Sequence, residues 1–226
     1  MPPQLQWTAS TAASLLHMAS MWCQGAEIVD ARIRAVLETS IAPIRDRLTS
    51  EGDALWSQCF ATLATDSNTL RWLAPPLLDP FLELGQAIES VLPDFDQQVA
   101  SRQRPLRDAW ESRGPGILSV LAKRGICASP QAHVVLVQPV VGGYGRVIAS
   151  GQLIMEAMLV NSIPRLPEVV RLAWLVAQTN MDNKTELDRL ALITAVVEAA
   201  AEVELVQPDE AIQLALKHWS LPSDVS

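Results

Sequence analysis

The segment from His133 to Gln178 constrains the fold more than any other part of this chain. It holds a β-branched apolar run, a glycine-rich turn, a second apolar run and then an apolar helix. The three glycines between Gly142 and Gly145 can adopt the positive φ angles that a tight turn requires. The pattern therefore predicts an antiparallel β-hairpin over residues 133–160, with its turn at these glycines.

The helix that follows the predicted hairpin has clear start signals. Pro167 is tolerated at a first helical position and Glu168 is favourable in a first turn. From Val169 to Ala177 only Arg171 is polar. A helix that is apolar nearly all round is buried on most sides, so we expect this to be the central helix of the fold. Pro139 has no N–H for a strand ladder and predicts an edge position or a bulge for the first strand.

Several segments of the first half favour helices. Residues 1–50 carry apolar side chains at three-to-four spacing, and a second helical pattern runs from Asp53 to Ala64. The polar span from Pro93 to Arg104 predicts a linker. Residues 106–124 are again helical, and the Gly114-Pro115-Gly116 sequence within them predicts two helices that meet at a bend.

The last part of the chain predicts two more helices. Asn183 and Glu186 have capping-box spacing, and Pro208 is suited to a helix start. We therefore expect an α+β fold that is predominantly helical, with one small antiparallel β-hairpin or sheet before a buried central helix. The linker divides the chain into an N-terminal helical region, residues 1–104, and an α+β core, residues 105–226, which holds the hairpin.

Composition narrows the class of protein. The formal net charge is −8, and Lys and Arg are not clustered, which argues against nucleic acid and anionic membranes as partners. The three cysteines, Cys23, Cys59 and Cys127, are odd in number and far apart, which favours reduced thiols in a cytoplasm. The apolar stretch from Ala9 to Met21 lacks a preceding Lys or Arg and is a poor signal peptide. These features predict an acidic, soluble, cytoplasmic protein.

No metal or cofactor site is predicted. His17, His133 and His218 are far apart, and none has a second ligand at metal-binding spacing. The glycines from Gly142 to Gly145 lack the Lys-Ser/Thr and the following helix of a phosphate loop. Cys127 is the cysteine best placed for exposure, but no histidine base can be assigned to it.

Glu156 is the ionisable residue that stands out, because it interrupts the apolar run from Leu153 to Leu159. A strand alternates its faces, which favours a solvent-exposed carboxylate. In the alternative, the carboxylate is buried and a cation holds it, with Arg171 as the candidate partner. That alternative would make Glu156 and Arg171 the candidate catalytic pair.

The order helix, strand, glycine turn, strand and buried helix resembles the core of the zincin metallopeptidases over about residues 105–205. In that family the buried helix bears a His-Glu-x-x-His motif. Here the matching residues, Val170 to Val176, contain neither histidine nor glutamate. The resemblance therefore implies a catalytically silent pseudoenzyme that holds no zinc. Glu198 and Glu202 resemble the position of a third ligand in one branch of the family, and alone they are expected to be exposed acids.

Two functional hypotheses follow. The first is a non-enzymatic soluble binding or assembly protein, whose partner is an unknown protein or a second copy of the chain. The alternative is an enzyme of unknown class with a site between the hairpin and the central helix that uses Glu156 and Arg171. The direction of the Glu156 carboxylate discriminates between them, because a catalytic carboxylate must face a concave pocket.

Overall fold

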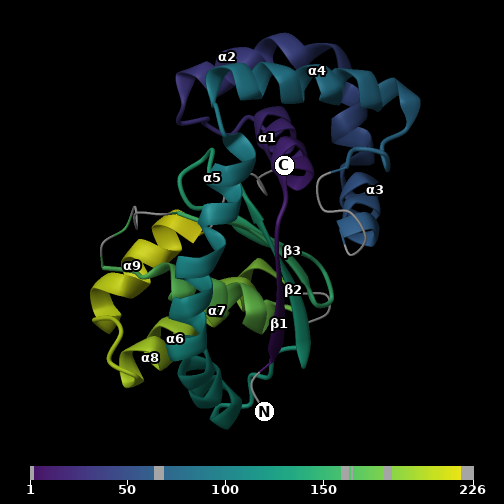
Figure 1. The fold of residues 1–226 in the computed structure, drawn as a ribbon. Coiled ribbons are helices and arrows are strands. Elements are labelled where there is room, and N and C mark those ends of the chain that lie inside the picture. Colours follow the sequence, from purple (N-terminus) through teal and green to yellow (C-terminus); the bar gives the residue numbers. More distant parts are fainter. Residues whose placement is uncertain (1–2, 64–68, 159–162, 164, 181–184, 220–226) are drawn as a thin grey trace.

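The structure is a computed structural model that describes residues 3–63, 69–158, 163, 165–180 and 185–219 (Figure 1). The strands are β1 (Gln4–Ala9), β2 (Gln131–Val137), β3 (Gly145–Ala149) and β4 (Gln152–Glu156). The helices are α1 (Thr11–Cys23), α2 (Ala31–Ser40), α3 (Arg45–Leu63), α4 (Pro75–Val91), α5 (Phe95–Ser101), α6 (Gln103–Lys123), α7 (Glu168–Gln178), α8 (Glu186–Glu202) and α9 (Pro208–Trp219), with a 3-10 turn at Ala42–Ile44. The predicted α+β, predominantly helical class is confirmed.

The sheet has the strand order β1-β2-β4-β3, and the predicted hairpin is wrong. β2 and β4 pair in parallel, while β3 pairs with β4 in the antiparallel sense. The hairpin therefore joins β3 to β4 and turns near Gly151, whose φ is 68°. β4 takes the central place because Leu153, Ile154 and Met155 are all buried, whereas every residue of β3 is partly or fully exposed.

The first strand was not predicted, because residues 1–50 show a helical pattern throughout. β1 pairs in parallel with β2, from Gln4 opposite Gln131 to Ala9 opposite Leu136. Because β1 and β4 flank it, β2 is a central strand and not the edge strand that Pro139 suggested. The proline lies after the end of β2 and so removes no ladder hydrogen bond.

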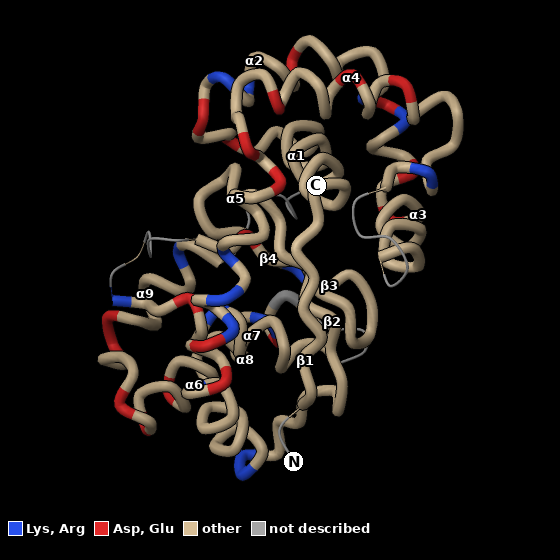
Figure 2. The backbone as a smooth tube through the Cα atoms, in the orientation of Figure 1, with Lys and Arg blue, Asp and Glu red and all other residues tan. Residues whose placement is uncertain are grey.

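The sheet lies between two groups of helices (Figure 1) and separates two apolar clusters. The α7-side cluster contains the buried apolar residues of α6 to α9 together with Val134, Leu136, Leu153 and Met155. The α1-side cluster contains those of α1 to α5 together with Val135, Val137 and Ile154. Strand side chains alternate between the clusters, as the pleat of a sheet requires. Within the four strands the charged residues are Arg146 and Glu156 (Figure 2).

The central helix is where the sequence placed it. All residues of α7 from Val169 to Ala177 are buried, Arg171 and Trp174 included. Of the described helices, none is long and apolar enough to cross a membrane.

Three other helix boundaries differ from the predictions. α3 begins at Arg45 and continues through Gly52 without the expected break, and the predicted linker contains α5 and the first residues of α6. α6 is one helix that includes Pro115, although two helices were expected. Apolar faces on these segments outweigh the local cost of glycine and proline, because helix stability in proteins comes mainly from packing.

The predicted division at residue 104 stays a prediction. It falls at the start of α6, and the helices before and after it contribute mainly to different clusters. However, β1 from the first region pairs with β2 from the second, so the two regions share one sheet.

Candidate functional site

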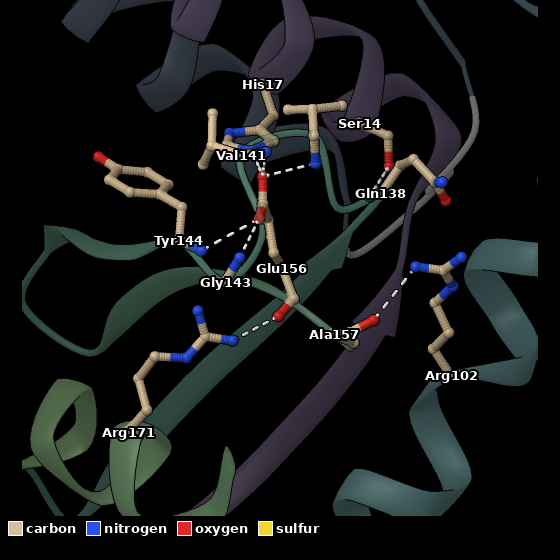
Figure 3. Close-up of polar contacts among 11 residues, drawn as sticks. Ser14, His17, Arg102, Gln138, Val141, Gly143, Tyr144, Glu156, Ala157 and Arg171 are labelled. Atoms are coloured by element: carbon tan, nitrogen blue, oxygen red, sulfur yellow. Dashed lines mark hydrogen bonds and ion pairs between the residues drawn. The ribbon is translucent and has the colours of Figure 1, made fainter. Parts of the chain in front are cut away.

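Glu156 is the last residue of β4 and is fully buried, so the predicted solvent-facing carboxylate is wrong. Alternation of faces places its side chain on the α1 side of the sheet, where a loop and a helix close over it (Figure 3). Backbone N–H groups of the loop between β2 and β3 donate to the carboxylate. Oε1 accepts from Val140 (2.8 Å) and Val141 (3.0 Å), and Oε2 accepts from Gly143 (2.7 Å) and Tyr144 (3.1 Å).

Glycine explains why this loop can surround a carboxylate. Gly142 and Gly143 have φ angles of 85° and 124°, a region that residues with a Cβ rarely adopt. These angles turn neighbouring N–H groups toward one point and form an anion-binding concavity. The glycine-rich segment is therefore a cradle for the protein's own carboxylate, and not the hairpin turn that its composition suggested.

A fifth donor comes from the N-terminal half of the chain. Nε2 of His17 on α1 lies 2.8 Å from Oε1 of Glu156, and both side chains are buried. The His17 ring stacks on Tyr144 with centroids 5.5 Å apart and an angle of 13° between the planes. Nδ1 of His17 is buried and has no hydrogen-bond partner in the part of the chain that the structure describes.

These contacts hold Glu156 in its ionised form. Burial alone would raise the pKa of the carboxyl group, because it penalises charge. The hydrogen bond and charge of His17, together with the N–H groups of Val140 and Gly143, outweigh burial and lower the pKa to about 2. The acid is thus strongly perturbed, as the buried alternative required, but its hydrogen-bonding capacity is used within the protein.

Arg171 does not bind the Glu156 carboxylate, contrary to the proposed pairing. Its Nη2 donates to the backbone oxygen of Glu156 at 2.6 Å (Figure 3). The same Nη2 donates to the carboxylate of Glu168, one turn earlier on α7. Burial raises the pKa of Glu168, and Arg171 only partly opposes that rise. On the other side of β4, Arg102 donates to the backbone oxygen of Ala157 at 3.3 Å. The two arginines therefore bind the main chain where β4 ends.

A second polar contact fixes the beginning of the same loop. The backbone N–H of Gln138 donates to Oγ of Ser14 at 3.0 Å, and that hydroxyl donates to the backbone oxygen of Ser10 at 2.8 Å. Ser10 and Ser14 are both fully buried. Helix α1 thus holds the loop at two points one helical turn apart, through Ser14 and His17.

The remaining histidines and the cysteines do not gather into a site. His133 bonds Thr8 Oγ1 at 2.8 Å and lies half-buried on β2, while His218 is exposed on α9. Cys59 is buried, which raises the pKa of its thiol to about 12, and Cys127 is exposed. Among the described residues, no three histidine, cysteine or acidic side chains are placed to hold a metal ion.

An open groove of about 900 Å³ lies where the end of α6 meets α8 and α9, and we call it the acidic groove. Its apolar lining residues are Ala201, Leu205, Val206 and Pro208, and its charged ones are Arg124, Arg165, Glu198, Glu202, Glu204 and Glu210. Arg124 pairs with Glu198 and Glu202, and Arg165 pairs with Glu210. Glu198 and Glu202 are exposed, as expected.

The acidic groove was not predicted from the sequence. Arg124 is the last residue of the predicted helix 106–124, and nothing in the local sequence indicates that it meets α8. Neither Glu156 nor Arg171 lines the groove. No family model matches the chain, and neither the curated proteins nor the solved structures contain a match to it.

Proposed function

We propose that this protein acts by binding another protein and not by catalysis, with the acidic groove as its contact surface. The observation that carries the proposal is the contrast between two polar sites. The carboxylate of Glu156 accepts hydrogen bonds from five donors inside the protein, so it has little capacity left to act as a base. The acidic groove, in contrast, is open and combines apolar lining with charge.

The charges of the groove define the partner. Four glutamates and two arginines line it, so the groove has a net charge of −2. Its apolar residues favour a partner that also presents apolar side chains. A segment with Lys or Arg beside apolar residues, such as a basic amphipathic helix, fits both features. The protein's net charge of −8 would also accelerate its association with a basic partner.

A peptide-binding experiment tests the proposal. Fluorescence anisotropy would compare a labelled basic amphipathic peptide with one in which every Lys is replaced by Glu. We expect binding of the basic peptide alone, with an affinity that falls as salt is added. The double variant E202Q/E210Q should weaken binding about tenfold, whereas Glu38→Gln on α2, outside the groove, should not. Equal affinity for both peptides, or equal effects of these variants, would refute the groove as the site.

The zincin-like scaffold remains a second proposal, supported by the burial of α7 beside a sheet. The residues from Val170 to Val176, which match the metal-binding motif of that family, pack in the α7-side cluster. A silent scaffold of this kind should carry no stoichiometric zinc when purified without a histidine tag, and no peptidase activity that a chelator abolishes. Elemental analysis that finds about one zinc per chain would contradict it.

A further inference from the structure

The two edges of the sheet differ in how they are protected. At one edge, β3 has a register irregularity between Val147 and Ala149, carries the charged Arg146, and packs against both α3 and α7. At the other edge, β1 contacts α6, but it has an unbroken register over its six residues and carries no charge or proline. Bulges, charges and prolines are the usual features that keep an edge strand from pairing with another chain. β1 lacks all three.

The free backbone groups of β1 belong to alternate residues. Gln4 N–H donates to Pro130 at 3.0 Å and Ser10 N–H donates to Leu136 at 3.2 Å, so the even-numbered residues direct their backbone groups to β2. The odd-numbered residues Leu5, Trp7 and Ala9 direct theirs away from the sheet. In the part of the chain that the structure describes, β1 pairs with no strand on that side.

We propose that β1 pairs with β1 of a second copy of this chain, antiparallel about a two-fold axis at Trp7. In this register Trp7 faces Trp7 of the other copy, and Leu5 faces Ala9. Each facing pair exchanges two backbone hydrogen bonds, so the outward groups of all three residues are satisfied. The two sheets become one continuous sheet across the dimer. The β1 edge and the acidic groove are different surfaces, so the dimer does not depend on binding at the groove.

A second copy fits this edge better than an unrelated chain for two reasons. The pairing is isologous: a two-fold axis at Trp7 places Leu5 opposite Ala9 in both halves of the interface, so no second, complementary surface is needed. The strand also lacks charge, so two chains of net charge −8 can meet there without like charges directly opposite. The half-exposed Trp7 side chains then become cross-strand neighbours, an arrangement that stabilises antiparallel pairs.

Sedimentation equilibrium of the full chain tests the dimer. The wild type should show a monomer–dimer equilibrium at concentrations up to about 100 μM. Ala9→Pro removes an outward N–H but leaves the ladder to β2 intact, so the dissociation constant should rise about tenfold with little change in the unfolding midpoint. Leu187→Ser, at the exposed apolar position on α8, is the matched surface control and should leave association unchanged.

Charge complementation separates lost pairing from lost folding. Trp7→Lys and Trp7→Glu each place like charges opposite each other across the two-fold axis, so each variant alone should be monomeric. An equimolar mixture should form a heterodimer, because Lys then faces Glu. A wild type that stays monomeric over the whole range would overturn the proposal, and so would a mixture in which dimers do not return.

Discussion

The two layers that cover the sheet are held by different kinds of contact. On the α1 side, five polar residues are buried: Ser10, Ser14, His17, Gln138 and Glu156. The side chains of all except Gln138 form hydrogen bonds that the structure describes. On the α7 side the central helix packs almost entirely through apolar side chains. Apolar packing is sensitive to volume, whereas hydrogen bonds are sensitive to direction and charge. The two layers should therefore respond to different substitutions.

The largest effect is expected from a loss of volume on the α7 side. Trp174 is buried and stacks on Trp219 with ring centroids 5.3 Å apart. Trp174→Ala should lower the free energy of unfolding by about 3 to 5 kcal/mol, because it removes a large side chain and leaves a cavity. Urea denaturation measures the change. Leu187→Ala, at an exposed position on α8, is the control and should change stability by less than about 0.5 kcal/mol.

On the α1 side, a change of charge without a change of size should have nearly as large an effect. Glu156→Gln keeps the shape of the side chain, but its amide NH₂ must face N–H donors of the loop or of His17. We expect a loss of about 3 kcal/mol in the free energy of unfolding, because buried donors lose their acceptor. Glu38→Gln, on the exposed side of α2, serves as the control. Equal stability of the two variants would show that the cradle contributes little.

We also expect the stability to depend on pH through Glu156, on the α1 side of the sheet. The pKa of Glu156 is about 2 in the folded protein, below the ordinary value of 4.5. The ionised carboxylate therefore makes its full contribution to the free energy of unfolding above about pH 4.5, and this contribution is lost as the pH falls toward 2. The stability difference between wild type and Glu156→Gln should narrow by about 2 kcal/mol between pH 6 and pH 3. A constant difference across this range would mean that Glu156 has an ordinary pKa. Burial, the largest cause of the raised pKa of Glu168, is common to both proteins, whereas the smaller rise caused by the Glu156 charge is lost in the variant.

The smallest expected effect concerns the second contact of the loop. Ser14→Ala removes the hydroxyl that accepts from the backbone N–H of Gln138 and leaves that donor buried. A loss of about 1 kcal/mol is expected in a thermal or urea unfolding experiment. Ser57→Ala on α3, where the exposed hydroxyl only bonds its own helix, is the matched control and should change little. An equal loss in both variants would show that Ser14 has no special role.

The sequence predicted helices well where the signals are local. The bounds of α7 and the start of α9 at Pro208 follow from helix-start residues and apolar content. The capping box before α8 was predicted at Asn183, which lies outside the described residues, and the structure forms it from Thr185 and Asp188. Two overlapping pairs with the same spacing compete for that role, and spacing alone does not choose between them.

The sheet and the site were harder to predict because they depend on distant partners. The alternation of side chains along a single strand predicted that Glu156 faces solvent. That pattern contains no information about hydrogen-bond donors from other parts of the chain. His17 lies 139 residues away in sequence, and the loop donors become available only when glycines turn the backbone. The strand order could not be predicted either. The three buried apolar residues of β4 indicate that both of its faces are covered, but they do not indicate which strands lie beside it.

The pairing of β1 with β2 has a consequence for how the chain is made. About 120 residues separate the two strands, so at ribosomal rates β1 is synthesised roughly 6 to 25 s before its partner. Closing such a long loop also makes this pairing a slow, late step in folding. During that interval both sides of an uncharged strand are unpaired. A nascent chain stalled before residue 131 should therefore be the form of this protein that is most dependent on chaperones.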